Sequence, residues 1–292
     1  MKTFTAAPAP SEAQKEAVRA LEARCNEADG TCLEIFLSNQ FNAHPEMDAF
    51  FFCEEDGELV GVLSLYADNE KEAEVSAVVR PDKRRQDVFR ALLTRALAAL
   101  APYAPETITF KTDAGCPAGP AVAARWQPRE RSREFFLIAE PGAAALPAGL
   151  EVGLAREEEL AALAVISQEA FGEEAEQAAR YMQNTFAGQD QLLFAARLDG
   201  VPVGSTSVDI AGRWAYLYGV CVAAGHRGRG MGKALLRGVL AALPQATGKR
   251  PALSVEADNS AALRLYTGAG FTLLTEHRYY AAPFAAVRDS LS

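Results

Sequence analysis

The sequence lacks any long uninterrupted apolar segment. None of its apolar runs approaches the roughly 18 residues that a membrane-spanning helix needs. The first residues, MKTFTAAPAPSEAQ, also lack the apolar core of a secretory signal peptide. We therefore expect neither a membrane span nor a membrane partner.

Cysteines and basic residues are also few. The five cysteines (Cys25, Cys32, Cys53, Cys116 and Cys221) show no Cys-x-x-Cys pair and no metal-ligand spacing. This pattern predicts reduced thiols in a cytoplasmic protein and no metal cofactor. The 29 Lys and Arg against 38 Asp and Glu give a net charge of −9. A charge of this sign argues against nucleic acid as a partner.

What the sequence does contain is an internal repeat. The chain has 292 residues, 49% of them hydrophobic, which is enough for two well-cored domains. Short motifs recur at a constant offset of 143 residues, a sign of a duplicated domain. The matched pairs are Asp56 with Asp199, Gly57 with Gly200, Gly61 with Gly204, and Arg84 with Arg227. We predict two α/β domains, 1–145 and 150–292, joined by the Pro/Gly-rich segment 141–149.

The second copy contains a glycine-rich loop between an expected strand and an expected helix. Residues 216–222 (YLYGVCV) have the composition of a strand, and apolar residues recur at helical spacing after Lys233. Between them lies RGRGMG, residues 227–232. This layout presents backbone N–H groups and the positive end of a helix dipole to an anion. The loop fits neither the G-x-G-x-x-G pattern nor the P-loop, because Ala234 follows Lys233. A plain surface loop is the alternative.

A second motif follows about 30 residues later. Residues 259–271 (NSAALRLYTGAGF) begin with an N-capping Asn259, contain Tyr266, and close with Gly270 and Phe271. Together with R-x-x-G-x-G at 227–232, this motif resembles the signatures of the GNAT superfamily of acyl-CoA-dependent N-acyltransferases. The resemblance is strong over residues 150–292. It implies two tandem GNAT-like domains, each a mixed, mostly antiparallel sheet flanked by helices.

The resemblance also implies where acetyl-CoA binds. The diphosphate is expected on the backbone N–H groups of the loop, and the pantetheine arm along the preceding strand as an added strand would pair. The N–H of Val222 is a candidate to polarise the thioester carbonyl. The expected cofactor-binding residues are Val220, Cys221, Val222, Arg227, Gly228, Arg229, Gly230, Met231, Gly232, Lys233 and Asn259.

Tyr266 matches the general acid of the family, which protonates the departing CoA thiolate, although a core aromatic is the alternative. The family's usual base position is Ser254, which cannot act as a base. Glu256 lies on the same strand face by period-two alternation and is our candidate. Tyr216, Tyr218 or a water chain are alternatives. We interpret Cys221 as a small buried side chain rather than a nucleophile.

The first copy has lost the loop glycines. Arg85, Asp87 and Phe89 stand where Gly228, Gly230 and Gly232 stand in the second copy. We therefore predict that the first domain is non-catalytic. The GNAT resemblance implies acetyl transfer from acetyl-CoA, by direct attack, to an amine of a small molecule or peptide. It also implies that residues 167–187 shape the acceptor site. A non-catalytic acyl-CoA sensor is the alternative, and a homodimer is left open.

Overall fold

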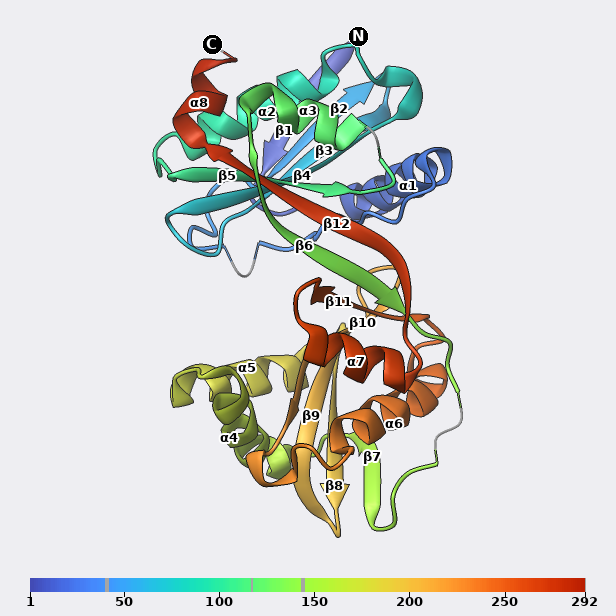
Figure 1. Cartoon of the computed structure of the whole chain (residues 1–292). Coiled ribbons are helices and arrows are strands. Elements are labelled where there is room, and N and C mark those ends of the chain that lie inside the picture. Colours follow the sequence, from blue (N-terminus) through green and yellow to red (C-terminus); the bar gives the residue numbers. More distant parts are fainter. Residues whose placement is uncertain (40–41, 117, 143–144, 292) are drawn as a thin grey trace. The chain divides into compact units, whose positions relative to one another are not determined.

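The computed structural model of the chain describes residues 1–39, 42–116, 118–142 and 145–291 (Figure 1). Residues 143 and 144 of the expected linker lie outside the described part. The chain forms two compact units: Met1–Glu134 with Thr275–Ser292, and Phe135–Leu274. Each unit is a mixed α/β structure, as predicted from the sequence.

Unit 1 contains a sheet in the order β1-β2-β3-β4-β5-β12. The described pairs are antiparallel except β4 with β5. Its strands are β1 (Lys2–Ala7), β2 (Phe50–Glu55), β3 (Glu58–Tyr66), β4 (Glu72–Val79), β5 (Thr107–Asp113) and the greater part of β12 (Thr272–Pro283), with the start of β6 (Arg129–Ile138). Its helices are α1 (Glu12–Asp29), α2 (Val88–Leu100), α3 (Ala118–Ala123) and α8 (Phe284–Asp289), with 3-10 turns η1 (Pro81–Lys83) and η2 (Ala124–Trp126).

Unit 2 repeats this plan with the order β6-β11-β10-β9-β8-β7. Again one described pair, β10 with β11, is parallel and the others are antiparallel. Its strands after β6 are β7 (Leu150–Leu154), β8 (Gln191–Leu198), β9 (Val201–Asp209), β10 (Ala215–Val222) and β11 (Pro251–Glu256). Its helices are α4 (Leu160–Phe171), α5 (Ala175–Ala187), α6 (Met231–Ala246) and α7 (Ser260–Ala269), with 3-10 turns η3 (Glu157–Glu159) and η4 (Ala224–His226).

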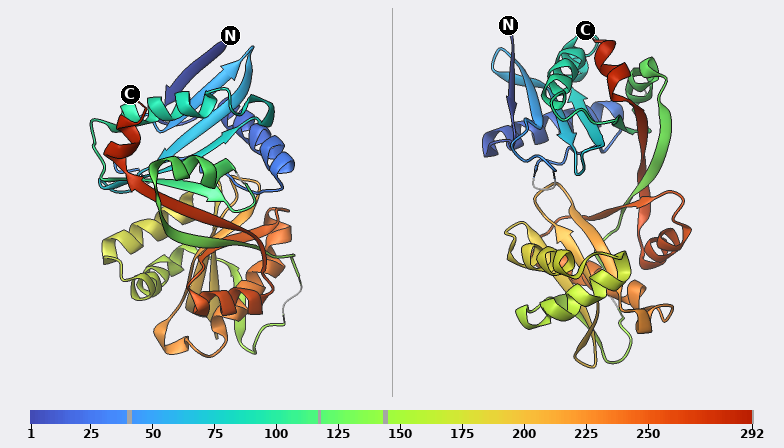
Figure 2. Two further views of the ribbon diagram at one scale, coloured as in Figure 1. Left: turned by 45° about the horizontal axis from the view of Figure 1, so that its top comes forward. Right: turned by 90° about the vertical axis from the view of Figure 1, so that its left-hand side faces the viewer.

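Helices cover both faces of each sheet (Figure 2). Successive strand residues point to opposite faces, and in the central strands the residues on both faces are apolar. In unit 1, Phe50 and Phe52 pack with α1, whereas Phe51 packs with α2. In unit 2, Leu193 packs with α4 and α5, and Phe194 packs with α6. Each sheet is therefore a buried middle layer.

The repeated Asp-Gly turns have the same backbone conformation in both units. Asp56 and Gly57 have φ values of 52° and 84°, and Asp199 and Gly200 have 50° and 81°. Positive φ at both central residues defines a type I′ hairpin turn, which Asp-Gly favours. The turns therefore set the registers of β2 with β3 and of β8 with β9.

The compact units do not follow the division at residues 141–149 that the sequence suggests. The last strand of the second copy, β12, pairs with β5 of unit 1 from His277 to Pro283. The end of the first copy lies beside β11 in unit 2, where the N–H of Ala139 donates to the carbonyl of Pro251 at 3.0 Å. The two copies thus exchange their final strands. The repeat predicts that these strands exist, but not which sheet edge each one joins.

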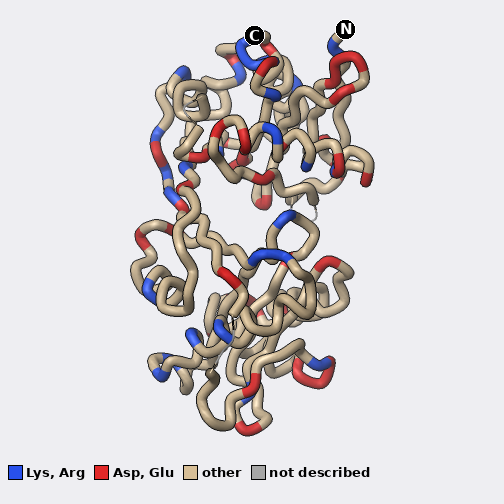
Figure 3. The backbone as a smooth tube through the Cα atoms, turned by 90° about the vertical axis from the view of Figure 1, so that its right-hand side faces the viewer, with Lys and Arg blue, Asp and Glu red and all other residues tan. Residues whose placement is uncertain are grey.

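Among the described residues, no helix combines the length and apolar composition needed to cross a membrane. Lys and Arg are interspersed with Asp and Glu along the backbone of both units (Figure 3). That nucleic acid is not a partner stays a prediction from the net charge.

Candidate acyl-CoA site in unit 2

The central strand β10 contains a bulge. Tyr218 lies opposite Ser207 of β9, but the next described pair is Cys221 with Ser205, so β10 has one extra residue. Gly219 sits in the bulge with a φ of 62°. The positive φ favours glycine, and a Cβ there would lie 2.7 Å from the Tyr181 hydroxyl oxygen, so Tyr181 would have to shift. The bulge reorients the end of β10 relative to β9.

Beyond the bulge, Val222 directs its polar groups away from β9. The N–H of Ala223 donates to Val203 of β9 at 2.9 Å. Because polar groups alternate between the two edges of a strand, Val222 presents its N–H and C=O to the opposite edge. The carbonyl of Val222 indeed accepts a hydrogen bond from Nε of Arg227 at 2.8 Å. The Val222 N–H therefore points away from β9, and its role toward the thioester stays a prediction.

In the described structure, β10 and β11 pair only where they begin. The described register joins Ala215 with Pro251 and Tyr216 with Ala252. Within the described pairing, residues 217–222 and 253–256 have no ladder partner on the facing strand. Unpaired edge groups of this kind can bind an extended ligand that carries amides. The pantetheine arm of CoA has this chemistry.

The glycine loop leads into an uncapped helix. Gly228 and Gly230 have φ values of 73° and 80°, a region that other residues rarely adopt. Gly230 is the N-cap of α6, and no described side chain caps its first N–H groups. The first turn therefore presents orphan N–H donors and the positive end of the dipole, as anion sites do.

The side chains near this turn are basic and unneutralised. Arg227 and Arg229 are exposed, and Lys233 is half-buried. Within the described part of the chain, none of the three forms an ion pair with a carboxylate. Gly232 could hold a Cβ at ordinary contact distance, 3.4 Å from Leu265, so the fold itself does not require glycine there. A ligand that approaches the backbone would explain that glycine.

Tyr266 lies on α7, whose first turn is capped by Asn259. The Asn259 side chain accepts the N–H of Ala262 at 3.0 Å, a structural role for this predicted cofactor-binding residue. The Tyr266 ring packs edge-on against Phe271 at 6.1 Å between centroids. Burial raises the pKa of Tyr266, and nearby Tyr216 raises it further. The phenol therefore keeps its proton at neutral pH, as a general acid must.

The candidate base is less well placed. Leu253 and Val255 of β11 are buried in the core, so Ser254 and Glu256 share the other face, as alternation predicts. Glu256 is exposed at the strand end. Tyr218, one alternative, donates to Oε1 of Gln191, and burial raises its pKa. A raised pKa makes Tyr218 a poor base, because the phenolate is scarce at neutral pH.

A polar cluster that the sequence did not reveal lies between α5 and β9. The Tyr181 hydroxyl is 2.8 Å from Oγ of Ser207, and its ring meets Tyr218 edge-on at 6.2 Å. Burial raises the pKa of Tyr181. Cys221 lies on the same face, 3.2 Å from Ser205, and burial raises the pKa of its thiol. Tyr181 lies within residues 167–187, the segment expected to shape the acceptor site. Its partners Ser207 and Tyr218 lie on strands β9 and β10, so the sequence alone could not identify them.

The corresponding loop of unit 1 keeps the backbone shape without the glycines. Arg85 and Asp87 have φ values of 59° and 60°, close to those of Gly228 and Gly230. Arg84 donates from Nε to the carbonyl of Val79 at 3.0 Å, as Arg227 does to Val222. Arg84 also forms a bidentate pair with Asp29 at 2.6 and 2.7 Å. The unit 1 loop thus keeps the fold but not the open, basic surface.

Comparison with known proteins agrees with this geometry. The family model described as "Acetyltransferase (GNAT) family" matches residues 15–114 and 158–271, more than half of the chain. The chain therefore belongs to the acetyltransferase (GNAT) family, and the two matches confirm the predicted tandem repeat. No match was found among curated proteins.

Solved structures with the same fold span the whole chain. A GCN5-related N-acetyltransferase from Sphaerobacter thermophilus has 21% identity and a TM-score of 0.71, covering 96% of both chains. A tandem GNAT protein from the clavulanic acid biosynthesis pathway, solved without AcCoA, has 20% identity and a TM-score of 0.70, covering 97% of this chain and 99% of that one. An acetyltransferase of the GNAT family from Colwellia psychrerythraea has 16% identity and a TM-score of 0.66, covering 95% and 99%. At these identities the likeness concerns the fold.

Proposed function

We propose that unit 2 transfers the acetyl group of acetyl-CoA to the amine of a small molecule by direct attack. One observation carries the proposal: an uncapped, basic helix N-terminus follows, after the glycine loop, a strand that in the described structure pairs with its parallel neighbour only at its start. Diphosphate and pantetheine are the two parts of CoA that these two features suit. Acetyl-CoA supplies the activated acetyl thioester.

In this proposal the chain binds, orients and donates a proton. The N–H groups from Gly228 to Lys233 hold the diphosphate, and Val220, Cys221 and Val222 align the pantetheine. The N–H of Val222, directed away from β9, hydrogen-bonds the thioester carbonyl. The protonated Tyr266 donates to the departing thiolate. Cys221 contributes backbone only, because its thiol is buried and held protonated.

The acceptor amine enters from the side of α4 and α5. Ser167 of α4 contacts Glu173 at 3.4 Å, and Tyr181 of α5 contacts Ser207. These polar groups would orient an acceptor with hydrogen-bonding substituents. The proton of the attacking amine leaves through Glu256 or through water. The cytoplasmic location stays a prediction, and a homodimer stays open.

The alternative is a sensor that binds acyl-CoA without turnover. It is favoured by one observation, that the family's base position is Ser254 and that Glu256 is exposed. Release of free CoA thiol from acetyl-CoA, measured over a panel of aminoglycosides, amino acids and polyamines, separates the two. Amine-dependent thiol release supports the enzyme. Tight CoA binding by calorimetry without release on any amine supports the sensor.

A further inference from the structure

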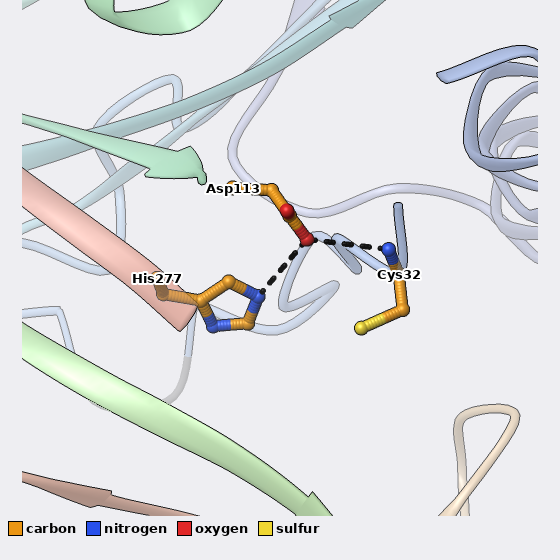
Figure 4. Close-up of side chains that lie close together, drawn as sticks. All are labelled: Cys32, Asp113 and His277. Carbon is orange, nitrogen blue, oxygen red and sulfur yellow. Dashed lines mark hydrogen bonds and ion pairs between the residues drawn. The ribbon is translucent and has the colours of Figure 1, made fainter. Parts of the chain in front are cut away.

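Unit 1 buries a cluster of three different metal-ligating side chains. Sγ of Cys32, a carboxylate oxygen of Asp113 and a ring nitrogen of His277 all lie within 4.8 Å of one another (Figure 4). The three residues are 7%, 2% and 3% exposed. They come from the segment after α1, from the end of β5 and from the exchanged strand β12. Their separation in the sequence explains why cysteine spacing gave no sign of them.

The carboxylate of Asp113 is fixed with one oxygen toward the other two groups. Its Oδ1 accepts from the N–H of Gly115 and from the hydroxyl of Thr275, both at 2.8 Å. Its Oδ2 lies 3.8 Å from Nε2 of His277 and 3.3 Å from the backbone nitrogen of Cys32. Ligands held by outer hydrogen bonds in this way are typical of metal centres.

The other two groups are also held in place. His277 lies directly opposite Asp113 in the β12–β5 ladder. The backbone on both sides of Cys32 is tied to Asn26, through the N–H of Thr31 at 3.0 Å and the carbonyl of Leu33 at 2.9 Å.

We propose that Cys32, Asp113 and His277 bind one Zn²⁺ ion, which ties the exchanged strand β12 to the rest of unit 1. Thiolate, imidazole and carboxylate are the ligands that Zn²⁺ takes, whereas Mg²⁺ and Ca²⁺ take oxygen. Bond lengths of about 2.0–2.3 Å place the ligand atoms of a tetrahedral ion roughly 3.3–3.8 Å apart. The ligand atoms, which lie within 4.8 Å of one another, need to approach by about 1 Å at most to reach these separations. Water would complete the fourth position.

The test uses the full chain, stripped of metal with a chelator and titrated with Co²⁺. We expect about one equivalent to bind, with visible d–d bands and a near-ultraviolet thiolate-to-cobalt band, and Zn²⁺ to displace it. Cys32→Ser should lose the thiolate band, and His277→Gln should weaken binding at least tenfold. Cys53→Ser and Cys116→Ser, which change other thiols of unit 1, are matched controls and should keep both properties. A thiolate band retained in Cys32→Ser, or no cobalt binding by the metal-free chain, overturns the proposal.

A second measurement covers the case in which the ligand variants fail to fold. Zinc at 100 times its dissociation constant should lower the unfolding equilibrium constant of the unmodified chain about 100-fold. Mg²⁺ at the same concentration should leave it unchanged. If zinc has no such effect, the proposed tie is wrong.

Discussion

Arg227 donates from Nε to the carbonyl oxygen of Val222 at 2.8 Å, and this bond holds the glycine loop against the end of β10. Arg84 makes the same bond to Val79 in unit 1, but its guanidinium is neutralised by Asp29. Both copies of the duplicated domain thus keep the arginine-to-carbonyl hydrogen bond that shapes the loop. At this position only the second copy has an arginine without a carboxylate partner in the described structure, and only the second copy has the loop glycines.

We predict that one chain binds one CoA. Asp87 of unit 1 lies where diphosphate would approach, and two unit charges about 4 Å apart interact by roughly 4 kcal/mol at an effective dielectric near 20. Since about 1.4 kcal/mol is tenfold, binding there should be weaker by orders of magnitude. Calorimetric titration of the full chain should give a stoichiometry near one. A value near two, or half of the sites surviving in Gly230→Asp, would contradict this.

Gly232→Asp should raise KM for acetyl-CoA at least tenfold and change KM for the amine little. The position accepts a Cβ without strain, so the variant should fold, and its carboxylate repels the diphosphate. Gly142→Asp, an exposed glycine with open space around it, is the control for added charge. Unchanged dependence on acetyl-CoA concentration would mean that the loop does not bind the diphosphate.

Tyr266→Phe should lower kcat about 10–100-fold with little change in KM for acetyl-CoA. A thiolate leaving group of pKa about 8.5 needs only modest acid assistance, so turnover slows without ending. The raised pKa of Tyr266 means that the acid is protonated through neutral pH and is lost only above about pH 10. The high-pH loss of kcat should therefore vanish in the variant. Tyr280→Phe, in unit 1, is the control and should retain the parent's pH profile.

Glu159→Gln should destabilise unit 2 by about 3 kcal/mol at pH 7. Glu159 and Arg197 are 6% and 4% exposed and are joined at 2.5 and 2.6 Å, and breaking a buried pair costs about 3–5 kcal/mol. The hydrogen bond from Arg197 holds the pKa of Glu159 below its ordinary value. Its stabilisation is present above about pH 4.3 and is lost as pH falls through the lower folded-state pKa.

Urea unfolding at pH 7 and at about pH 3 measures this effect. The variant should lose less stability between the two pH values than the parent chain. Glu157→Gln changes an exposed carboxylate of the same turn and should behave like the parent. Equal pH dependence in all three chains would show that the buried pair does not couple stability to pH.

Ala282→Asp should unfold unit 1 rather than unit 2, although residue 282 belongs to the second sequence repeat. Ala282 is buried in the core of unit 1 opposite Ile108, and an unpaired charge there has no compensating partner. Hydrogen exchange should lose protection across 107–113 and keep it across 201–209. Ala286→Asp, exposed on α8, is the control. Loss of protection in unit 2 alone would refute the strand exchange.

Local features were legible in the sequence because they depend on local backbone demands. Type I′ hairpin turns require positive φ at both central residues, which Asp-Gly sequences can adopt, and the φ values of Gly228 and Gly230 are ones that few other residues adopt. The loop, the helix that it begins and the Asn259 cap therefore lie where the sequence placed them. The roles of these residues toward acetyl-CoA stay predictions.

The sequence by itself determined the two α/β copies, their turns and the loss of the glycines in the first copy. Only the tertiary structure decided that β12 joins unit 1, that Tyr181 meets Ser207, and that Cys32, Asp113 and His277 converge. The reason is physical. Apolar periodicity specifies that a strand is buried, but a strand can be buried equally well at several sheet edges. The choice among them depends on packing and hydrogen bonds between residues far apart in the chain.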